Sequence, residues 1–168
     1  MIIIFVNKYL KRALVNLSGD IIIIEDDVED RDILLEIFQD VLDKNNYANR
    51  IVFLADSTRA MDYLKSEEAS PFLIVSDINM PMLDGFALRK KIFDDPDLND
   101  KCVPYIFLTT SGDNTDFMKR AYGLSVQGYF TKPNDYQAYF NLINDIIRYW
   151  KVAKIANRAQ EQVYVKNR

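Results

Sequence analysis

The stretch PFLIVSDINMPMLDGF, residues 71–86, sets an aspartate directly behind a buried strand and then turns the chain. Its four consecutive apolar residues at 72–75 have the length and continuity of a strand that is covered on both faces. Asp77 follows at the tip of this strand, and Pro81 and Gly85 favour a turn soon afterwards. The stretch therefore predicts a strand that presents a carboxylate at its carboxyl end.

Similar apolar runs recur along the chain and alternate with segments of helical periodicity. We expect five strands, at residues 21–24, 51–54, 72–75, 105–108 and 127–130, and five helices, at residues 28–42, 58–64, 85–93, 115–122 and 135–156. Five strand–helix repeats favour a parallel sheet wrapped on both faces by right-handed crossovers. The predicted fold class is α/β, a doubly wound five-stranded parallel sheet with an extended carboxyl-terminal helix.

A chain of 168 residues is long enough for one well-filled domain. We expect that domain at residues 19–150, with an amino-terminal extension at 1–18 and a helical tail at 151–168. The extension either forms a short amphipathic helix that packs on the body or is a poorly ordered addition from an upstream start. Lys8 and Lys11 soon interrupt its apolar run, so it resembles neither a secretory signal nor a membrane span.

Composition removes several classes of catalytic site. The chain has no histidine, which excludes Ser-His-Asp triads, Cys-His pairs and histidine-ligated zinc. A single cysteine, Cys102, can form no intramolecular disulfide, so a reducing cytoplasm is the expected location. Any acid, base or metal ligand must come from carboxylates, lysine, tyrosine or hydroxyl groups.

Charge is spread unevenly along the chain. Residues 1–17 carry +3 and residues 148–168 carry +5, which leaves −12 for residues 18–147 out of a total of −4. A body of this charge repels nucleic acid and suits a metal cation. The basic tail is either an interaction arm or, more simply, a solvated helix face.

Polar and charged side chains follow four of the five predicted strands. They are Glu25, Asp26 and Asp27 after the first strand, Asp77 after the third, Thr109, Thr110 and Ser111 after the fourth, and Lys132 after the fifth. Each has a simple structural interpretation, because acids cap helices and aspartate forms Asx-turns. Their joint occurrence at one edge of a parallel sheet, where such folds bind ligands, favours a functional site.

The residue types point to a specific chemistry. Clustered carboxylates repel one another, and a divalent cation relieves the repulsion. With oxygen ligands only, Mg²⁺ is the natural occupant. A carboxylate can attack phosphorus to form an aspartyl phosphate, and a lysine ammonium can then neutralise charge on the transferred group.

Four motifs together resemble the receiver domain of two-component response regulators: IIIIEDD, LIVSDINMPMLDGF, PYIFLTTS and YFTKP. They occur in the receiver order and spacing, and the similarity covers residues 19–149. The segments DPDL, TTS and RYW are most similar to those of the stand-alone regulators paired with bacterial phytochrome-type kinases. The resemblance implies the flavodoxin-like strand order 2-1-3-4-5.

The resemblance also implies a role for each matching residue. Asp77 corresponds to the phosphoacceptor, and Glu25, Asp26, Asp77 and the main-chain carbonyl of Asn79 correspond to the magnesium ligands. Thr109 and Lys132 correspond to the groups that contact the phosphoryl oxygens, and Thr109 and Tyr129 to the pair that switches conformation. Asp27 lies one place beyond the acid pair and is expected to begin a helix.

The implied function is that of a single-domain regulator, not an enzyme, phosphorylated by a sensor histidine kinase supplied in trans. A downstream phosphotransfer protein and a homodimer are possible partners, whereas nucleic acid and membrane are not expected. Two alternatives stay open: a phosphohydrolase with Asp77 as nucleophile, and an adaptor that works without phosphorylation. A nucleotide-binding module is disfavoured because the chain has no Gly-rich phosphate loop.

Overall fold

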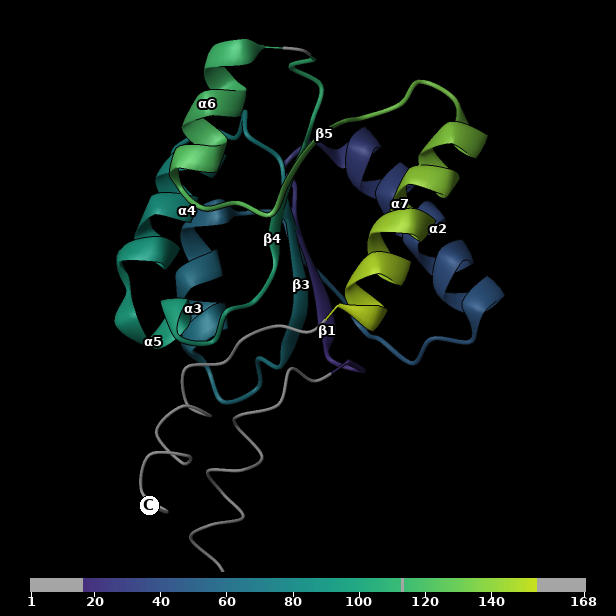
Figure 1. Ribbon diagram of the computed structural model, residues 1–168, viewed down its shortest axis with the longest axis horizontal. Helices are drawn as coiled ribbons and strands as arrows, with labels where there is room; N and C mark the ends of the chain where they lie inside the picture. The colour runs from purple at the N-terminus through teal and green to yellow at the C-terminus, as the bar shows by residue number, and fades with distance from the viewer. Residues whose placement is uncertain (1–16, 113, 154–168) are drawn as a thin grey trace, which may run out of the picture.

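The computed structural model describes residues 17–112 and 114–153. These residues form a five-stranded parallel sheet flanked by helices, with the predicted strand order β2-β1-β3-β4-β5 (Figure 1). In chain order the elements are β1 (Asp20–Ile24), α2 (Val28–Asn45), β2 (Ile51–Leu54), the 3₁₀ helix η1 (Ser57–Arg59), α3 (Ala60–Lys65), β3 (Pro71–Ser76), α4 (Gly85–Asp94), α5 (Pro96–Asn99), β4 (Tyr105–Thr109), α6 (Thr115–Gly123), β5 (Gly128–Thr131) and α7 (Tyr136–Val152).

The sheet has a hydrophobic layer on each face. Alternate residues of the strands point to opposite faces, so that Ile21 and Ile23 pack against α2 and α7, whereas Ile22 and Ile24 pack against α3, α4 and α6. Figure 1 shows α2 and α7 on one side of the sheet and α3 to α6 on the other. This two-sided burial explains the continuous apolar runs and confirms the predicted doubly wound α/β class.

The strand register brings the predicted site residues to one edge of the sheet. Ile24 of β1 pairs with Ser76 of β3, and Thr109 of β4 pairs with Thr131 of β5. Because the strands are parallel, the residues that follow them all emerge at the carboxyl edge. The sheet therefore gathers there the side chains that lie far apart in the sequence.

Two details differ from the sequence-based prediction. The short helix α5 was not predicted, since four residues are too few to show a period, and the helix expected at 58–64 is divided into the 3₁₀ helix η1 and α3. The expected continuation of the last helix to residue 156 was wrong, because α7 ends at Val152 and Ala153 has an extended conformation (φ −66°, ψ 136°). Val152, the last residue of α7, is 81% exposed and so contributes little packing at the helix end.

The remaining predictions about the ends of the chain concern residues 1–16 and 154–168, which lie outside the described residues. Among the helices that the structure describes, none is long and apolar enough to cross a membrane.

Candidate functional site

Asp77 lies at the carboxyl end of β3, next to the centre of the sheet. Its main-chain N–H donates a hydrogen bond to the carbonyl of Ile24, which continues the β1–β3 pairing by one residue. The residue is 7% exposed, and its Oδ2 atom accepts a hydrogen bond of 2.7 Å from the Asn79 N–H. Its Oδ1 atom is buried without a hydrogen-bond partner. Asp77 is therefore held rigidly and keeps one carboxylate oxygen unused.

The loop after Asp77 returns so closely that only glycine fits at its end. A Cβ atom on Gly85 would lie 2.2 Å from the main-chain oxygen of Asp77. The Gly85 N–H donates to the Ile78 carbonyl, and the Asp84 side chain caps α4 by accepting from the Ala87 N–H. These contacts explain why the turn residues of the 71–86 stretch follow the aspartate at this distance.

Glu25 supplies a second buried carboxylate from the end of β1. It is 2% exposed, and its Oε1 atom accepts a hydrogen bond of 3.1 Å from the Asp27 N–H. Burial raises the pKa of Glu25, and the nearby Asp77 charge adds to this effect, although hydrogen bonding to Lys132 opposes it. The carboxylate thus occupies a site where negative charge is unfavourable without a cation.

The other two residues of the EDD segment behave differently. Asp27 is the N-cap of α2 and accepts hydrogen bonds from the Glu29 and Asp30 N–H groups, which confirms its predicted role at the helix start. Asp26 is half-buried and makes no hydrogen bond or ion pair with another described residue. Its predicted part in metal binding therefore stays a prediction.

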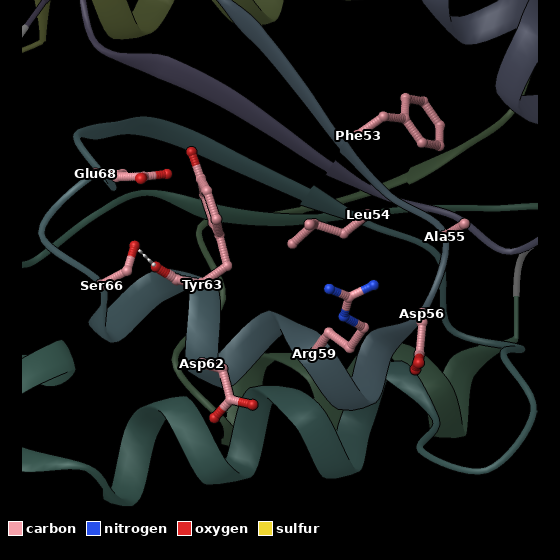
Figure 2. Close-up of a pocket in the computed structure, with 9 residues that line it drawn as sticks. All are labelled: Phe53, Leu54, Ala55, Asp56, Arg59, Asp62, Tyr63, Ser66 and Glu68. Carbon is pink, nitrogen blue, oxygen red and sulfur yellow. Dashed lines mark hydrogen bonds between the residues drawn. The ribbon is translucent and has the colours of Figure 1, made fainter.

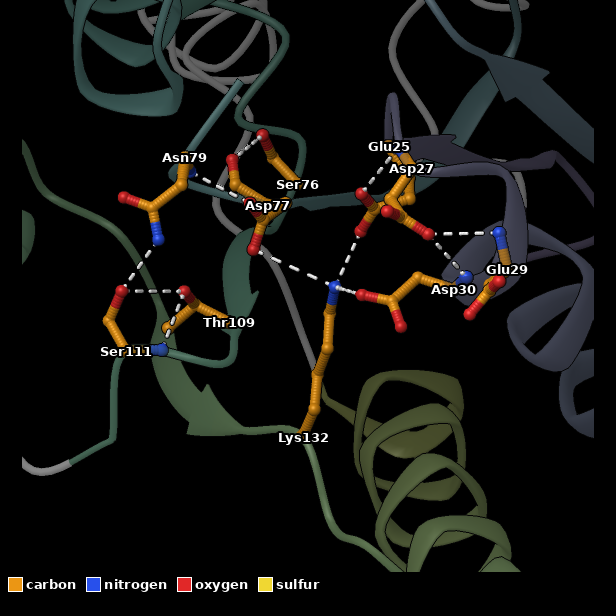
Figure 3. Close-up of polar contacts among 10 residues, drawn as sticks. All are labelled: Glu25, Asp27, Glu29, Asp30, Ser76, Asp77, Asn79, Thr109, Ser111 and Lys132. Carbon is orange, nitrogen blue, oxygen red and sulfur yellow. Dashed lines mark hydrogen bonds and ion pairs between the residues drawn. The ribbon is translucent and has the colours of Figure 1, made fainter. Parts of the chain in front are cut away.

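Lys132 joins the carboxylates from the end of β5. Its side chain is 6% exposed, and its Nζ atom lies 2.6 Å from Glu25 Oε2, 2.6 Å from Asp30 Oδ2 and 3.7 Å from Asp77 Oδ1 (Figure 3). Burial by itself would lower the pKa of Lys132, but the Asp30 and Glu25 carboxylates outweigh it and raise the pKa. The ammonium is therefore a permanent positive charge among three acids.

Asp30 was missed by the sequence analysis. It lies in the first turn of α2, where an acidic residue reads as an ordinary favourable charge at a helix amino terminus. Only the folded chain brings the first turn of α2 near the end of β5 and so pairs Asp30 with Lys132, 102 residues later in the sequence. No local sequence pattern indicates this pairing.

Hydroxyl and amide groups line the opposite side of Asp77. Asn79 Nδ2 donates to Ser111 Oγ at 2.7 Å, and Ser111 Oγ lies 3.3 Å from Thr109 Oγ1 (Figure 3). Thr109 is fully buried, and its Oγ1 atom also accepts from the Ser111 N–H. Tyr129 is half-buried on β5, with its hydroxyl donating to the Gly112 carbonyl at 3.3 Å.

A divalent cation fits the donor chemistry of this edge. In the described part of the chain no three carboxylate, histidine or cysteine side chains gather closely enough to form a metal cluster by themselves. Mg²⁺ does not need such a cluster, because proteins bind it through one or two carboxylates and several waters. The unpartnered buried Oδ1 of Asp77 is an available oxygen ligand, and Glu25 lies across Lys132 from it.

A cleft of about 690 Å³ lies elsewhere, along the edge strand β2 (Figure 2). Its lining mixes apolar and charged side chains from β2, α3 and the loops beside them: Phe53, Leu54, Ala55, Asp56, Arg59, Asp62, Tyr63, Ser66 and Glu68. None of the predicted site residues belongs to it. The candidate site is therefore the Asp77 edge rather than this cleft.

Comparison with known families agrees with this geometry. Residues 21–144 match the response regulator receiver domain. The chain belongs to the receiver domain family. The matched range contains every predicted site residue, from Glu25 to Lys132.

Individual relatives agree with this family assignment. It is 31% identical to the response regulator Rcp1 of Synechocystis sp. over 128 residues, which cover 73% of this chain and 85% of Rcp1. It is 28% identical to the probable methanogenesis regulatory protein FilR2 of Methanothrix harundinacea over 142 residues, or 79% of this chain and 90% of that protein.

Solved structures give the same result. The phosphorylated cyanobacterial phytochrome response regulator RcpA superposes with a TM-score of 0.70 at 28% identity, covering 82% of this chain and 98% of RcpA. The Mn²⁺-bound form of Rcp1 superposes with a TM-score of 0.68 at 28% identity, covering 82% of this chain and 99% of Rcp1. The predicted similarity to phytochrome-type response regulators is confirmed.

Proposed function

We propose that this receiver domain accepts a phosphoryl group on Asp77 from a sensor histidine kinase. The observation that carries the proposal is the buried Oδ1 atom of Asp77, which has no hydrogen-bond partner and faces the Lys132 ammonium at 3.7 Å. A buried polar atom without a partner is costly in a purely structural role. Its cost is explained if the oxygen is kept available to react.

The ligands for Mg²⁺ would be the carboxylates of Glu25, Asp26 and Asp77 with the main-chain carbonyl of Asn79. When bound, the ion would neutralise charge on the phosphoryl group and on the carboxylates around it. Support comes from the oxygen-only donor set and from relatives described as a Mn²⁺-bound Rcp1 and a sensor kinase receiver domain with magnesium in its cleft.

In the transfer step, a carboxylate oxygen of Asp77 attacks phosphorus and forms an acyl phosphate, while the bond from phosphorus to the donor breaks and the donor leaves with its electron pair. The ammonium of Lys132 then pairs with a phosphoryl oxygen, for which it has to move only a short distance. The Thr109 hydroxyl is close enough to the same edge to exchange its contact with Ser111 for a phosphoryl oxygen.

This rearrangement would act as the switch. Movement of Thr109 vacates space beside β5, and Tyr129 can leave the Gly112 carbonyl and turn inward. The altered surface of α6, β5 and α7 would then contact a partner, either a downstream phosphotransfer protein or a second copy of the chain. Residues 1–168 contain no histidine, so the donor histidine would lie outside them, and we place the exchange in the cytoplasm.

Turnover as a phosphohydrolase is expected to be slow. Such an enzyme would benefit from a carboxylic acid two positions after the nucleophile, but that position holds Asn79, whose amide is engaged with Ser111. Steady release of phosphate from small phosphomonoesters would favour the enzyme instead.

The test is phosphorylation by acetyl phosphate with Mg²⁺, read by intact-protein mass spectrometry. We expect one phosphoryl group on the wild-type chain and on Asp32→Asn, a control that removes an exposed carboxylate of α2. Asp77→Asn should remain unmodified. Equal modification of Asp77→Asn, or no modification of the wild-type chain, would reject the proposal.

A further inference from the structure

The ammonium of Lys132 is held away from Asp77 by a residue outside the predicted site. Its Nζ atom lies 2.6 Å from Asp30 Oδ2, a normal distance for a charge-assisted hydrogen bond, but 3.7 Å from Asp77 Oδ1, which is beyond one. Figure 3 shows the ammonium between Asp30 and Glu25, with Asp77 across the gap.

Local structure fixes Asp30 in this place. Its main-chain N–H donates to the Asp27 carboxylate that caps α2, so the first turn of the helix sets where its side chain begins. The Asp30 side chain is 34% exposed, whereas those of Lys132 and Glu25 are 6% and 3% exposed. Asp30 therefore reaches the buried ammonium from the solvent side of the cluster.

We propose that Asp30 is a positioning residue, which retains the Lys132 ammonium on the α2 side and so keeps Asp77 Oδ1 open to a metal ion. An ammonium has three donors, and at present Glu25 and Asp30 take two of them. Without Asp30, the buried Asp77 Oδ1 atom, 3.7 Å away and without a hydrogen-bond partner, is an available acceptor, and the ammonium would move toward it. It would then compete with a divalent cation for the same oxygen.

The local charge acts in the same direction. Removing the Asp30 carboxylate takes one negative charge from the edge where the cation would bind, and this also weakens attraction for Mg²⁺. Both effects predict lower metal affinity rather than a change of fold. The inference rests on the proposed use of Asp77 and Mg²⁺, but its readout does not require phosphorylation.

The experiment compares Mg²⁺ binding to the full chain by isothermal titration calorimetry. We expect Asp30→Asn to weaken binding by about tenfold, whereas Asp30→Glu, which keeps the charge, retains most of the affinity. The matched control is Asp32→Asn, which removes an equal charge from the same helix at a side chain that is 70% exposed and pairs with Arg31. It should change the affinity by less than about twofold.

A crystal structure of Asp30→Asn supplies a second readout. The ammonium should lie about 2.8 Å from Asp77 Oδ1, at hydrogen-bond distance. Unchanged Mg²⁺ affinity in Asp30→Asn, an equal loss in Asp32→Asn, or an ammonium that stays in its present position would overturn the inference. If the wild-type chain took up no phosphoryl group while Asp30→Asn still lost Mg²⁺ affinity, the proposed function would fail and the positioning role would stand.

Discussion

The two ends of β1 each carry a buried carboxylate, but their surroundings differ. At the amino end, the Asp20 carboxylate accepts hydrogen bonds from Arg50 at 2.9 and 3.0 Å, from the Tyr63 hydroxyl at 3.2 Å and from the Ser70 N–H at 3.4 Å. Burial alone would raise the pKa of Asp20, yet these donors outweigh it and lower the pKa. Both oxygens of this carboxylate are satisfied.

At the carboxyl end of β1 the carboxylates are not fully satisfied by donors. Three acids, Glu25, Asp30 and Asp77, share one ammonium, the pKa of Glu25 is raised, and Asp77 Oδ1 has no hydrogen-bond partner. The same strand therefore ends in a satisfied polar network on one side and an unsatisfied one on the other. The first stabilises the fold, and in the function proposed above the second would bind a cation and accept a phosphoryl group.

The largest expected change in the free energy of unfolding comes from replacing Lys132, which pairs with the carboxylates at the carboxyl end of β1. Lys132→Met should lower the free energy of unfolding by about 3 kcal/mol, because it leaves the buried Glu25 carboxylate without its charged partner. Urea denaturation at neutral pH without divalent cations measures the change. Unchanged stability would mean that Lys132 does not neutralise the cluster.

A smaller loss is expected at the satisfied end. Asp20→Asn should lower the free energy of unfolding by about 1.5 kcal/mol at pH 7, since Arg50 is largely exposed and its ion pair is screened by solvent. Because the folded pKa of Asp20 is lowered, its contribution is complete above the ordinary value of 3.8 and is lost as the pH falls through the lowered value.

The difference between wild type and Asp20→Asn should therefore narrow on acidification, which a series of urea titrations from neutral to acid pH can follow. A difference that stays constant down to the lowest pH would show that the Asp20 charge contributes nothing.

The smallest expected change is an increase in the free energy of unfolding. Asp77→Asn should raise the free energy of unfolding by about 1 kcal/mol without metal, because it removes one of three clustered negative charges. The amide oxygen can still accept from the Asn79 N–H, so the loop should keep its position. Urea denaturation in the presence of a chelator measures the gain, and a loss of stability would mean that Asp77 is a structural residue like Asp20.

Much of this fold could be predicted because the patterns that indicate it lie within short stretches of the sequence. Near-continuous apolar runs located four of the five strands, a shorter apolar segment at 127–130 located the fifth, and the residue types at their ends located the candidate site, including Glu25, Asp77 and Lys132. Asp30 could not be found in this way, because its pairing with Lys132 joins two residues that are 102 positions apart and meet only in the folded chain. The end of α7 at Val152 was also missed, because the apolar pattern of the sequence continues past it.

The most direct test of the account compares the two ends of β1 in the presence and absence of Mg²⁺. At a concentration one hundred times the dissociation constant, Mg²⁺ should raise the free energy of unfolding of the wild-type chain by about 2.7 kcal/mol. Asp20→Asn should gain the same increment and Asp77→Asn much less. Equal stabilisation of Asp77→Asn, or no stabilisation of the wild-type chain, would contradict the claim that the unsatisfied carboxylates at the Asp77 edge form a cation site.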